Sequence, residues 1–215
     1  MSQDVTETKT QNGMKATDFD LSNEIKFDPD KGLTTFRDSR IVLFDADAIG
    51  LLRQSLIDHM GIEKAREFFL KFGYQHGFSD FIQMKVNYKF ESEMDLLASG
   101  PVIHTYEGIV QATPKEISFN RETGEFYFTG TWTNSYEAEQ HLSYQEVSSE
   151  PVCWTLMGYA SGWCTAFFGK PLLAIEPVCM GKGDDHCEWE IQPLSKWGEE
   201  AIPYITALDQ FWNND

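Results

Sequence analysis

The sequence lacks positive charge. Its 17 lysine and arginine residues stand against 34 aspartate and glutamate residues, which gives a formal net charge of −17 over 215 residues. An acidic surface of this kind repels phosphate backbones and anionic lipids. We therefore expect the chain to make no direct contact with nucleic acid and none with a membrane.

Long apolar runs and nucleotide-binding motifs are also missing. The apolar runs fall well short of the roughly 20 residues that a bilayer requires, and no signal peptide is present, which together predict a cytoplasmic protein. The sequence contains no GxxxxGK[ST] loop, no GxGxxG motif and no basic helix-turn-helix segment. A nucleophile paired with a base at a recognisable spacing is missing too. These absences argue against an ATPase, a DNA-binding domain and a dinucleotide-dependent enzyme.

Apolar residues, in contrast, are plentiful. The composition is 41% hydrophobic and 14% aromatic. A chain of this length builds one large domain, or two interlocked modules, with a sizeable core. The aromatic content is enough to line an apolar cavity as well.

Cysteine is scarce, but its placement is informative. The stretch EPVCMGKGDDHCEW has the pattern of a strand, a glycine turn and a second strand. Its two thiols, Cys179 and Cys187, would meet across the ladder. Cys153 lies upstream at the start of an apolar helical run, and Glu176 stands three residues before Cys179. These four residues form a plausible closed, four-coordinate metal site.

Zinc is the natural occupant of such a site, because thiolates with one harder ligand suit it and four protein ligands leave no open position. Two alternatives remain open on the residues alone. The cysteines can be buried and inert, as core cysteines often are. A disulfide is a weaker rival, because a reducing cytosol opposes it. Cys164 would project from the far end of the helix and is assigned to the core.

Periodicity predicts an α+β fold, in which an antiparallel meander packs against helices. Asp45 and Ser135 are each expected to cap a helix. Expected helices cover residues 45–60, 62–76, 79–88, 91–98, 135–142, 149–168 and 195–212. Expected strands cover residues 40–44, 102–112, 115–119 and 125–134, and the cysteine hairpin follows. Strand alternation would place His104 on one face of its strand, together with Tyr106, Gly108, Val110 and Ala112.

Two sets of segments resemble known families. GKGDDHCEWEI and EPVCWTLMGYASGWCTAFFGK are similar to the 4-vinyl-reductase-type domain. MDLLASGPVIHTYEGIVQATPKEISF is similar to the N-terminal module of the XylR/DmpR/MopR group, bacterial sensors of aromatic compounds that activate sigma-54-dependent transcription. The resemblance covers about residues 20 to 210. It implies a disordered tail (1–18), a sensory module (19–134), a zinc module (135–195) and a C-terminal helix (196–215) that leads to an absent linker and AAA+ ATPase.

The resemblance also implies specific site residues. In the family's phenol sensors, zinc sits on three cysteines and one glutamate, and the matching positions are Cys153, Glu176, Cys179 and Cys187. A histidine and a tryptophan hydrogen-bond the phenol hydroxyl, and the matching positions are His104 and Trp132. We expect the cavity walls to include Leu97, Val110, Phe128, Met157 and Tyr159. Small or soft residues at Gly130, Met157 and Ala174 lead to the hypothesis of a cavity that accepts substituted phenols.

Three functions therefore compete. The resemblance favours a homodimeric, zinc-stabilised receptor for aromatic effectors, which controls a downstream ATPase in aromatic hydrocarbon catabolism. The first alternative is a zinc-dependent enzyme that acts on an aromatic substrate, with His104 as a general base. The second is a structural module for assembly, which would have no ligand-sized cavity.

Overall fold

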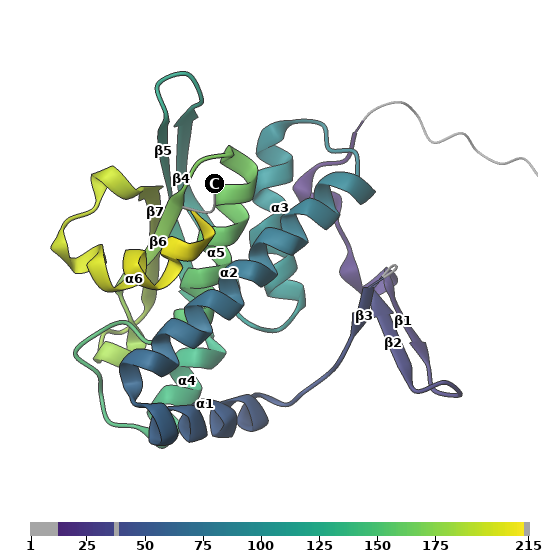
Figure 1. Ribbon diagram of the computed structural model, residues 1–215. Helices are drawn as coiled ribbons and strands as arrows, with labels where there is room; N and C mark the ends of the chain where they lie inside the picture. The colour runs from purple at the N-terminus through teal and green to yellow at the C-terminus, as the bar shows by residue number, and fades with distance from the viewer. Residues whose placement is uncertain (1–12, 37–38, 213–215) are drawn as a thin grey trace, which may run out of the picture.

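The structure, a computed structural model, describes residues 13–36 and 39–212 (Figure 1). The helices are α1 (Ala46–Met60), α2 (Ile62–Asn87), α3 (Glu93–Tyr106), α4 (Tyr136–Tyr144), α5 (Trp154–Phe168) and α6 (Ile202–Leu208). The strands are β1 (Ile25–Asp28), β2 (Leu33–Phe36), β3 (Ser39–Ile41), β4 (Gln111–Asn120), β5 (Glu125–Thr133), β6 (Leu172–Val178) and β7 (Cys187–Pro193). This arrangement confirms the α+β class.

The main sheet has four antiparallel strands in the order β4-β5-β7-β6. Strand β5 alternates between buried and more exposed positions, as expected, and its buried face carries Phe126, Phe128, Gly130 and Trp132. The cysteine hairpin, β6 and β7, joins the same sheet because β7 pairs with β5. The two regions that the sequence separates into modules thus share one continuous sheet.

Helix α5 lies between the sheet and α2 (Figure 1), and the two helices touch through glycines. A Cβ atom at Gly77 would lie 2.2 Å from the carbonyl oxygen of Tyr159, and one at Gly162 would lie 2.0 Å from that of Tyr74. Gly73 and Gly158 face the opposite backbone in the same way. We call these four glycines the glycine seam. Backbone approaches backbone along it, which only glycine permits.

The seam explains one wrong prediction. The sequence predicts two helices over residues 62–76 and 79–88, because Gly73 and Gly77 weaken the pattern. The structure has one continuous helix, α2, over Ile62–Asn87. Contact with α5 compensates the low helix propensity of glycine, which is a tertiary effect and leaves no local trace.

Helix α3 corrects two further predictions. The helix expected over residues 91–98 was to end at Ser99-Gly100-Pro101, with a strand from 102 to 112. Instead, α3 continues through Pro101 to Tyr106, and β4 begins only at Gln111. Proline removes the hydrogen bond to the carbonyl four residues earlier, here that of Leu97. The indole N–H of Trp163 donates to this carbonyl at 3.1 Å, so the helix keeps its course.

The cap predictions for α1 and α4 are confirmed. The Asp45 side chain accepts a hydrogen bond from Ala48 N, and that of Ser135 accepts one from Ala138 N. At the C-terminus, the single helix expected over residues 195–212 is wrong. Three short 3-10 turns flank the seven-residue α6. Gly198 interrupts the helical pattern, and Pro203 is tolerated only because it lies in the first turn of α6.

The N-terminal part differs from the sequence prediction as well. Residues 1–12 of the predicted disordered tail lie outside the described residues, but residues 13–18 are tied to the body. Met14 N donates to Lys89 O at 2.8 Å, and Glu91 N donates to Met14 O at 2.9 Å. Strands β1 to β3 form a small antiparallel sheet that stands beside the main body (Figure 1). The strand expected over residues 40–44 is shorter, since β3 ends at Ile41.

Candidate functional site

The four residues of the predicted metal site come together in the structure. Cys153 is the N-cap of α5, Glu176 lies on β6, Cys179 follows β6, and Cys187 opens β7. One ligand atom from each lies within 4.8 Å of all the others, and all four side chains are buried. All four cysteines of the chain are free thiols. The cluster is therefore able to bind a metal ion.

The donor set fits a divalent cation in its hydrogen bonding too. Glu176 Oε2 accepts a hydrogen bond from Cys153 N at 3.4 Å, whereas Oε1 is buried without a partner among the described residues. Burial raises the pKa of Cys153 and that of Glu176. A cation would reverse that preference, because it binds the ionised forms of these groups. Met180 N donates to Cys187 Sγ at 3.3 Å and helps to hold that ligand in place.

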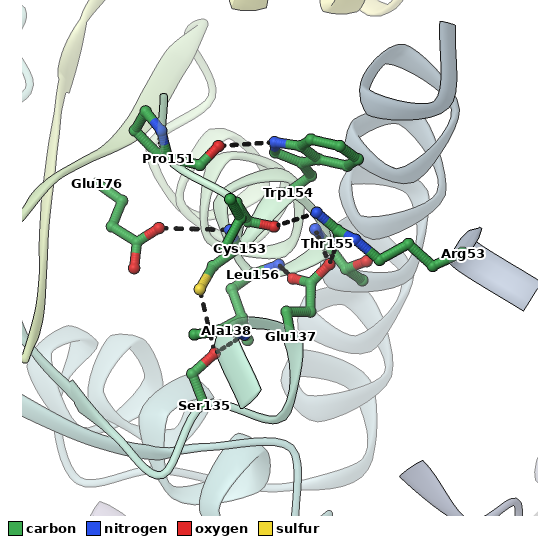
Figure 2. Close-up of polar contacts among 11 residues, drawn as sticks. Arg53, Ser135, Glu137, Ala138, Pro151, Cys153, Trp154, Thr155, Leu156 and Glu176 are labelled. Carbon is green, nitrogen blue, oxygen red and sulfur yellow. Dashed lines mark hydrogen bonds and ion pairs between the residues drawn. The ribbon is translucent and has the colours of Figure 1, made fainter. Parts of the chain in front are cut away.

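A buried ion pair fixes the end of α5 that carries Cys153 (Figure 2). The Glu137 carboxylate accepts hydrogen bonds from Thr155 N at 3.1 Å and Leu156 N at 3.0 Å. Arg53 pairs with Glu137 at 3.1 Å and donates to Val152 O at 2.9 Å. Burial raises the pKa of Glu137, and Arg53 opposes this shift. A carboxylate from α4 thus caps the N-terminus of α5, where an anion is favoured.

This cap corrects the predicted start of α5. The sequence places the start near residue 149, with Ser149 as the cap. The helix begins at Trp154, because Glu137 satisfies the first N–H groups from a distant position in the chain. The indole of Trp154 donates to Pro151 O at 2.7 Å, and the Arg53 guanidinium lies 3.7 Å from the centre of its ring (Figure 2). Arg53 and Glu137 were not predicted, because nothing in a local pattern pairs residues 84 positions apart.

A second feature is a small apolar cavity between α3, α5 and the sheet. Its volume is about 30 Å³, which is room for one or two waters. The lining residues are Gly100, Pro101, His104, Ala112, Phe128, Trp132, Tyr159, Ala160, Trp163, Cys164, Trp189 and Ile191. An aromatic ring can enter only if some of these side chains move outward.

The cavity contains four of the seven predicted ligand-binding residues: His104, Trp132, Phe128 and Tyr159. Leu97, Val110 and Met157 are buried in the surrounding core and do not line it. His104 reaches the cavity from α3 and not from a strand, so the predicted strand face that it shares with Val110 does not exist. Cys164, assigned to the core, is buried in the cavity wall.

The hypothesis of an enlarged cavity loses its basis at all three of its positions. The space beside Gly130 is filled, because a Cβ atom there would lie 2.4 Å from Cζ2 of Trp189. Met157 and Ala174 are fully buried but are not part of the lining. Trp163 and Trp189 were not predicted as site residues, although both are large aromatic residues in the segments that resemble the family.

The two predicted recognition residues present free polar atoms. Among the described residues, neither the His104 imidazole nor the Trp132 indole N–H has a hydrogen-bond partner, although both side chains are at most 4% exposed. Burial lowers the pKa of His104 to about 3, with a smaller contribution from His76. The imidazole is therefore neutral near pH 7 and offers one acceptor and one donor.

Tyr159 forms the wall beside His104, with ring centres 3.7 Å apart. Its hydroxyl donates to Asp80 Oδ2 at 3.0 Å, and His76 Nε2 lies 3.3 Å from the same oxygen. Burial raises the pKa of Asp80, which His76 and the Tyr159 hydroxyl oppose. The tyrosine hydroxyl is thus held by α2, and its ring faces the cavity.

Comparison with known proteins agrees with this geometry. Residues 20–120 match the family model described as activator of aromatic catabolism, and residues 132–193 match the 4-vinyl-reductase domain. The solved phenol-responsive sensory domain of the transcription activator PoxR, bound to phenol, superposes with a TM-score of 0.81 at 31% identity. This superposition covers 89% of our chain and 94% of that one. The chain belongs to the XylR/MopR family.

Two curated relatives extend the comparison. The phenol regulator MopR of Acinetobacter guillouiae is 35% identical over 192 residues, which is 87% of our chain. The transcriptional regulatory protein XylR of Pseudomonas putida is 28% identical over 196 residues, or 91% of our chain. The chain spans about a third of the length of each relative, at 34%. Since these relatives are regulators, the enzyme alternative is not favoured.

The described helices were also compared with the requirements of a bilayer. Within residues 13–36 and 39–212, none combines the length and the apolar character that crossing a membrane demands.

Proposed function

We propose that this chain is the effector-binding domain of a cytoplasmic, sigma-54-dependent transcription activator, and that it recognises phenolic compounds. The observation that carries the proposal is the pair of unpaired polar side chains, His104 and Trp132, at one apolar cavity. Unpaired buried polar groups cost about 1–3 kcal/mol each, and a ligand hydroxyl would remove that cost. The similar sensory domain of PoxR was solved with phenol, which supports this choice of effector.

The recognition chemistry follows from the two side chains. Neutral His104 accepts the proton of a phenol hydroxyl, and the Trp132 indole N–H donates to its oxygen. The apolar walls supply most of the affinity, at ~25 cal/mol per Å² of buried ring surface. A ligand without the hydroxyl leaves both polar groups unpaired, so the site discriminates against hydrocarbons.

Zinc is the metal that we assign to the cysteine cluster. Three thiolates and a carboxylate leave no open position, which makes its role structural. The cluster joins α5 to both strands of the hairpin, and α5 also carries Tyr159, Ala160 and Trp163 of the cavity. Zinc would therefore fix the helix that forms one wall of the effector site.

We further propose a homodimer, in which an AAA+ ATPase follows this domain in the full-length protein. Exposed apolar side chains on α1 and α2 support the dimer: Leu51, Leu52, Phe68 and Phe72 are each between 47% and 55% exposed. Such a density of exposed large apolar residues is typical of an interaction surface. Effector binding would shift the balance between two arrangements of sensor and ATPase.

Calorimetric titration of zinc-loaded protein tests the effector proposal. We expect phenol to bind with one site per chain, and toluene, which lacks the hydroxyl, to bind about 5- to 150-fold more weakly, as ~1–3 kcal/mol implies. His104→Ala should bring the affinity for phenol down to that for toluene. The control is His59→Ala, which changes an exposed histidine on α1. No heat with phenol, or equal binding of toluene, would contradict the proposal.

A further inference from the structure

The six tryptophans divide into two groups by the fate of their indole N–H. Four donate to a protein oxygen: Trp154 to Pro151 O, Trp163 to Leu97 O, Trp197 to Leu173 O and Trp212 to Tyr74 Oη, at 2.7 to 3.2 Å. The other two, Trp132 and Trp189, have no partner among the described residues. Both of these line the same apolar cavity.

Trp189 is the more constrained of the two. Its side chain is 2% exposed, and its Nε1 atom is buried without a hydrogen bond to any described residue. A buried donor in this state is rare in native proteins and destabilises the fold, so it calls for a partner that is absent from the chain itself. Trp132 has its partner in the proposed phenol hydroxyl, whereas Trp189 has none assigned.

The packing keeps Trp189 from finding a protein partner by rotation. It pairs across the sheet with Gly130, where a Cβ atom would lie 2.4 Å from its Cζ2 and 2.8 Å from its Cε2. The Phe128 ring meets it edge to face, with ring centres 4.7 Å apart. The indole is therefore locked into the slot that the glycine leaves, beside the cavity.

The two free indoles also lie at a distance that one small molecule can span. The ring centres of Trp132 and Trp189 are 6.2 Å apart, and the ring planes are inclined by 33°. The rest of the cavity wall is apolar apart from His104 and the ring of Tyr159. A ligand that satisfies both indoles needs two acceptors on one ring.

We infer that Trp189 is a second hydrogen-bond donor of the effector site, and that the preferred effectors are phenols with a second oxygen substituent on the ring. This inference rests on the proposed phenol-sensing function. The hydroxyl binds between His104 and Trp132, and the second oxygen accepts the N–H of Trp189. Methoxyphenols, dihydroxybenzenes and nitrophenols share this chemistry.

Matched ligand pairs test the assignment. Calorimetry compares 2- and 3-methoxyphenol with 2- and 3-ethylphenol, which have nearly the same size and lack the second oxygen. We expect the native protein to bind at least one methoxyphenol about 5-fold or more tightly than its ethyl partner, the range for one buried hydrogen bond. Trp189→Phe keeps a ring in the slot, removes the donor and should abolish this preference. Its affinity for phenol itself should change by less than about 3-fold.

The control variant is Trp197→Phe, which removes an indole donor that is paired with Leu173 O and lies outside the cavity lining. It should keep the preference for the methoxyphenol. An unchanged ratio of methoxyphenol to ethylphenol affinity in Trp189→Phe would overturn the inference while phenol binding remains. The loss of phenol binding by native protein would instead overturn the proposed function.

A spectroscopic readout covers the case in which Trp189→Phe fails to fold. The indole N–H resonance of Trp189 in native protein should move downfield on addition of the preferred methoxyphenol, because a new hydrogen bond forms. The matching ethylphenol should leave the resonance near its free position. Equal shifts with both ligands would refute the hydrogen bond.

Discussion

His104 illustrates at the residue scale what burial does to a histidine. The imidazole is 4% exposed, and its pKa falls to about 3 from the ordinary value of 6.5. In the unfolded chain the same group takes up a proton near pH 6.5. Between these two values the unfolded state binds more protons than the folded state, so stability is lost as the pH falls.

This linkage predicts a specific pH dependence. From pH 7 to pH 5.5, the native protein should lose about 1 kcal/mol more unfolding free energy than His104→Gln, which has no titrating group at this position. Urea unfolding at a series of pH values measures the difference. Parallel stability curves for the two proteins would show that His104 is not buried in its neutral form.

The Arg53–Glu137 pair gives a second prediction at this scale. Glu137→Gln leaves the Arg53 charge buried without a counter-charge and weakens the cap of α5. We expect a loss of about 3 kcal/mol in unfolding free energy, measured by denaturant unfolding. Glu139→Gln, on the exposed side of the same helix, should change stability by less than ~0.5 kcal/mol. Equal effects of the two variants would contradict the buried ion pair.

The residues of the site differ in how far the sequence reveals them. The cysteines and Glu176 follow from chemistry and spacing, and the structure gathers them into one cluster. His104 and Trp132 were found through the family resemblance, and both line the cavity. Trp189 was missed because its role depends on the gap at Gly130 on the neighbouring strand. Such a cross-strand relation becomes visible only once the register is known.

At the scale of elements, caps were predictable and glycines were not. Asp45 and Ser135 cap their own helices, so a local pattern is enough to locate them. Gly77 breaks a helix by local propensity, yet it lies mid-helix in α2 because α5 packs against it. Pro101 is the same case, since its cost is relieved by Trp163 from another helix.

The glycine seam yields a prediction for the α2–α5 pair. Gly77→Ala raises helix propensity but places a Cβ atom against the Tyr159 carbonyl, so the helices must separate. We expect a net loss of about 2 kcal/mol or more, seen as a lower thermal midpoint. Gln75→Ala, at an exposed position of the same helix, should be neutral within ~0.5 kcal/mol. If Gly77→Ala stabilised the protein, the close backbone contact would be refuted.

At the scale of the whole molecule, the metal cluster ties separate parts of the chain together. Cys153 comes from the start of α5, while the other three ligands come from the hairpin. This hairpin and the α+β class were predicted from the sequence. The pairing of β7 with β5, which completes one sheet from both regions, was not, because strand pairing across 50 or more residues has no local signature.

Removal of the metal should therefore affect global stability. Treatment with a chelator is expected to cost on the order of 5 kcal/mol or more, which lowers the thermal midpoint by at least ~10 °C. Cys187→Ser should bind less metal by elemental analysis and lose most of the response to the chelator. Cys164→Ala should keep one metal ion per chain, because Cys164 lies outside the cluster. A chelator that leaves the midpoint unchanged would contradict a structural metal.

The glycine seam has a mechanical consequence for the molecule. Side chains normally form a compressible layer between two helices, but here backbone meets backbone, so α2 and α5 behave as one stiff beam. Tyr159 lies at the cavity end of the seam. One turn away, Tyr74 stacks on Phe211 with ring centres 4.6 Å apart and accepts a hydrogen bond from the Trp212 indole. An outward push on the cavity wall therefore arrives at the C-terminal segment without being absorbed on the way.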